Sequence, residues 1–104
     1  MIRLDTTTRT LQLFLAGSVT TSQLQVTVCY SDQTISTYNG ATQLSVSNGT
    51  TAVTVCAAPA SGAIRDIDLV NVLNTDTASA TVTLQIFDSS TSTAYEQITV
   101  ALSV

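Results

Sequence analysis

Residues that commonly carry enzyme chemistry are scarce in this chain. It has no histidine, its only basic residues are three arginines, and its seven acidic residues include a single glutamate, Glu96. General acid–base catalysis near neutral pH usually depends on a histidine or on a pair of carboxylates with perturbed pKa values. The four glycines are scattered, so no phosphate-binding loop is apparent. These features predict a protein that is not an enzyme and has no catalytic residues and no cofactor.

Asp66 and Asp68 are the closest pair of acidic residues. Two positions apart on a strand, they would share one face of a sheet. With help from Asp32 or Asp76 they could bind Ca²⁺ through carboxylate oxygens. The alternative is an exposed face on which they form ion pairs with Arg65 or Arg9. Because the spacing of a calcium-binding loop is absent, we favour the ion pairs and predict no metal site.

Cys29 and Cys56 are the only cysteines. Two are too few for a disulfide-stapled scaffold and, without histidine, too few for a structural zinc site. Both fall within strand-like segments, at positions expected to point away from the core. We expect two reduced thiols rather than a disulfide, since synthesis in a reducing compartment is expected.

The composition argues against several classes of partner. The net charge is −4, and three arginines cannot neutralise a run of phosphates, which disfavours nucleic acid and an anionic membrane surface. No apolar run approaches the roughly 18 residues of a membrane span. The start, MIRLDTTTRT, has no signal-peptide pattern. We therefore expect cytoplasmic synthesis, with no membrane and no nucleic-acid partner.

The pattern of polar and apolar residues predicts β-structure. Charged residues are only 10% of the chain, and twenty threonines and twelve serines supply the polar surface instead. Threonine suits a half-exposed strand because its branched Cβ restricts χ1. Apolar and polar residues alternate in seven segments: 11–17, 22–32, 41–47, 50–58, 63–74, 78–88 and 95–104. We predict one all-β domain over 1–104, an antiparallel β-sandwich of about seven or eight short strands or, alternatively, a small β-barrel.

The same alternation assigns side chains to faces. The residues expected to point inward from the first segments are Leu11, Leu13, Leu15, Leu24, Val26, Val28, Tyr30, Val53 and Val55. In 63–74, residues 67, 69, 71 and 73 fall on one face, and the apolar character of both faces at its end predicts a central strand. Asn39-Gly40 and Asn48-Gly49 are pairs preferred in type I′ hairpin turns. The polar segments 74–78 and 88–93 are expected to be hairpin loops, the first within a hairpin spanning 65–88.

A longer stretch carries a family resemblance. The sequence NGTTAVTVCAAPASGAIRDIDLVNVLNTDTASATVTLQIFD (48–88) combines an NGTT turn, a valine-alternating strand, a small-residue AAPA loop, an arginine that opens a strand, and D-T-A before a Thr/Val strand. This succession resembles tailed-bacteriophage virion structural proteins, and 16–32 resembles the strand that precedes it there. The matching positions are Asn48 to Val55, Ala57 to Ala60, Arg65, Asn71 to Asn74, Asp76 to Ala78 and Thr81 to Leu84.

The resemblance implies a non-enzymatic virion protein, foremost a capsid decoration (cement) protein. Such a protein would stabilise the head by binding the major capsid protein or another virion protein, as a homo-oligomer such as a trimer. A neck, tail or fibre-attachment module is the alternative within the class. A carbohydrate- or surface-binding β-sandwich is the alternative outside it, although three Tyr, two Phe and no Trp offer few stacking platforms. Apolar faces such as Val70 with Val72, and Phe87, exceed what a thin core can cover, which favours assembly.

The candidate partner-binding residues lie near the start of the chain and beside a loop. Ile2, Arg3 and Leu4 belong to residues 1–8, an expected N-terminal arm that could add a strand to a neighbour's sheet. Arg65, beside the loop around Pro59, could bind a partner's carboxylate through two hydrogen bonds. The alternative is that the arm is the first strand of the chain's own sheet.

Overall fold

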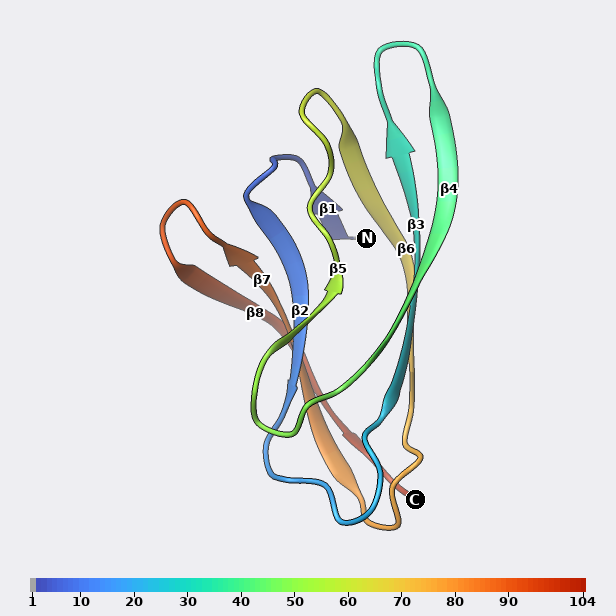
Figure 1. Ribbon diagram of the computed structural model, residues 1–104, viewed down its shortest axis with the longest axis vertical. Coiled ribbons are helices and arrows are strands. Elements are labelled where there is room, and N and C mark those ends of the chain that lie inside the picture. The colour runs from blue at the N-terminus through green and yellow to red at the C-terminus, as the bar shows by residue number, and fades with distance from the viewer. Residues whose placement is uncertain (1) are drawn as a thin grey trace.

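The computed structural model describes residues 2–104, and within them it contains eight β-strands and no helix (Figure 1). The strands are β1 (Ile2–Leu4), β2 (Arg9–Leu15), β3 (Gln25–Gln33), β4 (Tyr38–Val46), β5 (Val53–Cys56), β6 (Ile64–Leu73), β7 (Ala80–Asp88) and β8 (Thr93–Leu102).

These strands form two four-stranded sheets with the core between them. One sheet has the order β1-β6-β3-β4, the other has the order β5-β2-β7-β8, and all neighbouring strands are antiparallel. In Figure 1 the layer of β3, β4 and β6 lies on the right, and the layer of β2, β7 and β8 lies on the left. The predicted all-β sandwich is confirmed, and the sheets are not closed into a barrel.

The core takes alternate residues from the strands. Leu11 and Leu13 of β2 are 0% exposed and Leu15 is 2% exposed, as the alternation predicted. Burying one such side chain contributes about 1.5–3 kcal/mol. The other apolar members of the core are Leu4, Leu24, Val26, Val28, Val55, Cys56, Ile67, Val82 and Leu84.

A β-bulge breaks the alternation between β3 and β6. Cys29 pairs with Leu69 but Tyr30 pairs with Ile67, so Asp68 is an extra residue on β6. An extra residue moves every later side chain to the opposite face, because the strand repeat is two residues.

Beyond the bulge, Val70 and Val72 pack toward the opposite sheet, whereas Leu69, Asn71 and Leu73 are exposed. The predicted face that joined residues 67, 69, 71 and 73 is therefore wrong. The sequence pattern alone could not locate the bulge, because the residues on both sides of it are apolar.

The first predicted turn is also wrong. Asn39 and Gly40 lie within β4, opposite residues 31 and 32 of β3. The β3–β4 turn falls instead at 34–37, where the Thr34 N–H donates to the Thr37 carbonyl at 3.0 Å and their hydroxyls lie 2.6 Å apart. These threonine contacts provide the turn that the Asn-Gly pair was expected to make.

The remaining turns join strands in different ways. A turn does form at Asn48-Gly49, with the Thr51 N–H bonded to the Asn48 carbonyl at 3.0 Å and Gly49 at φ 57°, but it connects β4 and β5, which belong to different sheets. Residues 74–78 likewise cross from one sheet to the other, so the predicted hairpin over 65–88 is wrong. The hairpin loop near 88–93 is confirmed, since Asp88 pairs with Thr93.

Both cysteines are free thiols, in different surroundings. Cys29 is partly exposed on β3, and Cys56 is fully buried. The expectation that Cys56 points outward is wrong, because the β2–β5 register shifts next to it and both Val55 and Cys56 enter the core. Burial raises the pKa of the Cys56 thiol.

Candidate protein-binding surface

The three candidate arm residues form a strand of the chain's own sheet. Ile2, Arg3 and Leu4 make up β1, which pairs with residues 65–67 of β6. Leu4 is fully buried, and Arg3 donates two hydrogen bonds to the Asp66 carboxylate at 2.7 and 3.2 Å. The bond to Asp66 raises the pKa of Arg3. These contacts match the alternative interpretation of the arm, and contact of these residues with a partner stays a prediction.

Arg65 joins three parts of the sandwich. Its side chain is 11% exposed and donates to both carboxylate oxygens of Asp32, at 2.7 and 2.9 Å. It also donates to the Ala57 carbonyl at 2.8 Å and lies 4.1 Å above the centre of the Tyr30 ring. The bond to Asp32 raises the pKa of Arg65. Its predicted contact with a partner's carboxylate is untested, and its donors already serve β3 and the loop after β5.

Asp66 and Asp68 have separate partners. Asp66 accepts from Arg3, as described above, and Asp68 accepts from the Ser31 hydroxyl at 3.1 Å. Over residues 2–104, no group of three or more Asp, Glu, Cys or His side chains is placed to hold a metal ion. Asp66 does form an ion pair, but with Arg3 rather than Arg65 or Arg9. The expectation that it lies on an exposed face is wrong, because Asp66 is 4% exposed.

Asp76 joins the loop before β3 to the loop before β7. Its carboxylate accepts hydrogen bonds from the backbone N–H groups of Thr20, Thr21, Ser22 and Thr77 and from the Thr21 hydroxyl. The backbone donors, Thr20 and Thr21 above all, hold the pKa of Asp76 well below its usual range. Asp76 is therefore a structural residue that holds the loop before β3 against the loop before β7.

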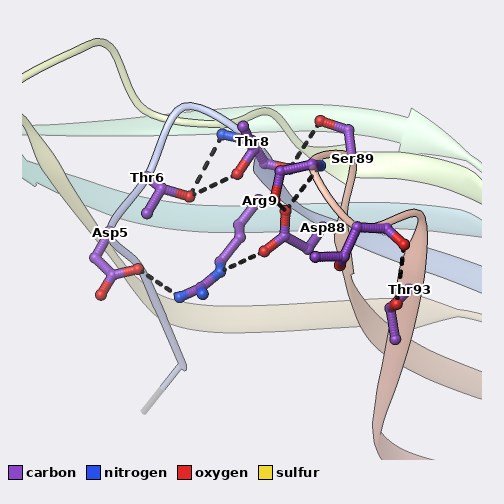
Figure 2. Close-up of polar contacts among 9 residues, drawn as sticks. Asp5, Thr6, Thr8, Arg9, Asp88, Ser89 and Thr93 are labelled. Atoms are coloured by element: carbon purple, nitrogen blue, oxygen red, sulfur yellow. Dashed lines mark hydrogen bonds and ion pairs between the residues drawn. The ribbon is translucent and has the colours of Figure 1, made fainter.

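Arg9 plays a similar role at the other end of the sandwich, and Figure 2 shows its contacts. Its guanidinium donates to Asp88 at 3.1 Å and to Asp5 at 2.9 Å, between the β1–β2 turn and the β7–β8 hairpin. Bonds from the Ser90 hydroxyl and then from Arg9 hold the pKa of Asp88 well below its usual range. Each of the three arginines thus has an aspartate partner in the same chain.

Exposed aliphatic side chains gather on the outer face of the β4–β3–β6 sheet. On β4, Val46 pairs with Gln25 of β3 and Leu44 pairs with Thr27. On β6, Leu73 pairs with Gln25 and Leu69 pairs with Cys29, so a row of β3 residues lies between the two strands. We call this set the outer apolar face. Its members and their exposed fractions are Leu44 75%, Val46 54%, Leu69 55% and Leu73 57%.

A groove opens on the inner side of the same part of β6. Its volume is about 320 Å³, and Val70 and Val72 form one wall. The floor and the other wall come from β7 and β8. Their aliphatic residues are Val82, Leu84, Ile98, Val100 and Leu102. We call this space the β6–β8 groove.

The last five residues of β6 supply both features. Leu69 and Leu73 belong to the outer apolar face, and Val70 and Val72 belong to the groove. The sequence signal is the apolar character of both sides of this segment, which predicts a central strand and, at Val70 and Val72, an excess that favours assembly. The central-strand interpretation is correct only for residues 65–67, where β6 lies between β1 and β3. The rest is an uncovered edge, so sequence reasoning missed this candidate site.

Comparison with known proteins adds no relative. No protein-family model matches the chain, and neither the curated proteins nor the solved structures include a significant match. None of the elements in 2–104 is a helix with the length and hydrophobicity needed to cross a membrane.

Proposed function

We infer that this protein is a non-enzymatic structural component of a phage virion, foremost a decoration protein that binds the major capsid protein. The outer apolar face carries this proposal. Clustered exposed apolar side chains mark protein-binding surfaces, because water around them is released when a partner covers them. Here a pair on β4 and a pair on β6 lie on either side of an uncharged row of β3 residues that includes Gln25 and Thr27. The resemblance of 48–88 to virion proteins supplies the class of partner.

Low surface charge supports the same role. Only 10% of the residues are charged, and each arginine is paired with an aspartate of the same chain. A surface with few unpaired charges offers little repulsion to a neighbouring subunit. The exposed aromatic side chains Tyr38 and Tyr95 lie on β4 and β8, in different sheets, so they do not form one stacking platform for a sugar.

The number of copies per particle tests the proposed class. Gel densitometry of purified particles of the encoding phage is expected to show hundreds of copies of the chain. About a dozen copies would instead indicate the neck or tail, since those parts occur once per particle. Absence from purified particles would overturn the proposal.

The outer apolar face is tested with matched serine variants. Leu69→Ser and Leu44→Ser change side chains that are already exposed, so the fold is expected to persist. Ile35→Ser is the control, because Ile35 is fully exposed at the β3–β4 turn, outside the face. Co-sedimentation with heads that lack the chain is expected to be about tenfold weaker for each face variant and unchanged for the control. Equal binding by all three variants would contradict the assignment of this face.

A further inference from the structure

The edge of β6 lacks a strand partner over most of its length. On one side, β3 pairs with β6 from Ile64 to Leu73, apart from the bulged residue Asp68. On the other side, β1 pairs only with residues 65–67. Among residues 2–104, no strand follows β1 along residues 68–73. Unpaired N–H and C=O groups of such an edge are a template for an added strand.

The opposite sheet extends beneath this vacant position. β7 is the only strand whose backbone lies beside β8, and the inward side chains of β8 face the groove rather than another strand. Ile98 is 50% exposed and Val100 is 41% exposed, whereas the equivalent inward residues of β2 are 0–2% exposed. The aliphatic side chains of β8 are therefore arranged like those of a core strand, with one strand of cover missing.

We propose that the β6–β8 groove accepts a single extended segment of a partner subunit, which pairs with residues 68–73 of β6 and continues the line of β1. This inference rests on the proposed function for the partner's class, a virion protein. The mode of binding is strand addition: backbone hydrogen bonds go to the β6 edge, and alternate side chains enter the groove. Among the described residues, the β1–β6 pairing ends at Ile2 and Ile67, and residues 68–73 follow directly on β6.

The shape of the site selects the occupant. The groove is bounded by Val70 and Val72 of β6 and by aliphatic residues of β7 and β8. A segment one strand wide would complete this layer as β1 does at residues 65–67. The lining is aliphatic apart from Asn71, so a charge pointing inward would lose its hydration without a partner. A segment with uncharged aliphatic residues at every second position fits these walls.

The chain's own C-terminus offers a test. The Asn74 side chain lies 3.4 Å from the carbonyl oxygens of Leu102 and Ser103, so the C-terminus lies near the lower end of β6 (Figure 1). A Gly/Ser linker followed by six alternating Thr and Val residues can be added after Val104. Six residues of strand span about 20 Å, the length of residues 68–73. The control is an extension of the same length made only of Gly and Ser.

The Thr/Val extension is expected to raise the melting temperature by several degrees over the Gly/Ser extension and to weaken binding to heads at least tenfold. Val100→Asp places a charge in the groove and is expected to abolish the thermal gain of the extended chain. Its effect on the melting temperature of the unextended chain is expected to be small, because Val100 is already partly exposed, whereas binding of that chain to heads is expected to weaken. Insertion of the extension into a second copy would give dimers by light scattering, which also supports a strand-accepting groove.

Two results would overturn the inference. Equal melting temperatures for the two extensions, without dimers, would show that the groove accepts no strand. A thermal gain with undiminished binding to heads would show that the partner does not use the groove. If the unextended chain binds no heads at all, the proposed function fails instead, and the thermal gain alone then decides whether the groove accepts a strand.

Discussion

β2 and β8 belong to the same sheet and carry the same alternating pattern, yet they differ in cover. The inward leucines of β2 are 0–2% exposed, while Ile98 and Val100 of β8 are 50% and 41% exposed. β2 lies between β5 and β7, and its inward side chains are covered by the other sheet. β8 is an edge strand, and its inward side chains face the β6–β8 groove. The comparison shows that an alternating pattern predicts which face of a strand is apolar. It does not predict whether the same chain or a partner buries that face.

Truncating one residue in each strand gives the largest expected difference. Leu13→Ala is expected to lower the free energy of unfolding by about 2–5 kcal/mol, because it leaves a cavity in a packed core. Ile98→Ala is expected to cost less than about 1 kcal/mol, because Ile98 is half exposed on an edge strand. Urea denaturation followed by circular dichroism measures both. Equal costs would mean that β8 is covered within the isolated chain.

Loss of the Asp76 carboxylate tests how the covered part of the sandwich is held together. Asp76→Asn removes a charged acceptor of backbone N–H groups from Thr20 and Thr21, so the melting temperature is expected to fall by several degrees. Asp68→Asn is the control, since Asp68 is exposed and accepts only from the Ser31 hydroxyl. Thermal unfolding monitored by circular dichroism compares them. An equal, small change in both variants would contradict a structural role for Asp76.

Acid is expected to weaken the same contacts. The pKa values of Asp76 and Asp88 are lowered in the folded chain, so the unfolded chain binds more protons and stability rises with pH. The stabilisation is fully present above the ordinary aspartate pKa of about 3.9 and is lost as pH falls below it. The loss is measured as the change in denaturant midpoint between about pH 6 and about pH 2, a range that spans the titration of aspartate. Constant midpoints would refute this assignment, and Asp88→Asn should flatten the profile.

The smallest expected effect is a difference between the two thiols in their rate of alkylation. It is measured on the unmutated protein. Cys29 is partly exposed and Cys56 is fully buried, with burial raising the pKa of the Cys56 thiol. Alkylation of the native protein without reductant is expected to modify Cys29 first and Cys56 only on unfolding. Mass spectrometry reads the order. Equally fast modification of both would mean that the β2–β5 region opens readily, and a chain two hydrogens lighter would reveal a disulfide.

The sequence predicted the fold class because alternation is repeated over many segments and each inward set is aliphatic. Leu11, Leu13 and Leu15 are a clear case, because β2 pairs with β7 in continuous register along this stretch. Local pattern failed where one extra residue, Asp68, reverses the alternation in β6, and where threonine contacts rather than Asn39-Gly40 form a turn. The bulge depends on pairing between distant strands, whereas the turn depends on local threonine contacts that alternation does not reveal.

The candidate site was only partly predictable for the same reason. Apolar residues on both faces of 69–73 are visible in the sequence, and the excess at Val70 and Val72 was interpreted as favouring assembly. In the described part of the chain, β1 pairs with β6 only at residues 65–67, and such strand pairing is a property of the sheet. The predicted partners of Asp66 and Asp68, Arg65 or Arg9, are likewise wrong, since the Arg3–Asp66 and Arg65–Asp32 pairs join residues far apart in the chain.

A reconstruction of the phage particle that locates this chain tests the central claim most directly. The account predicts that the chain lies on the head, that a partner covers Leu44 and Leu69, and that one extra extended segment lies along residues 68–73 of β6, over Ile98 and Val100. A chain absent from the particle, or one bound there with its outer apolar face and the β6–β8 groove open to solvent, would contradict it.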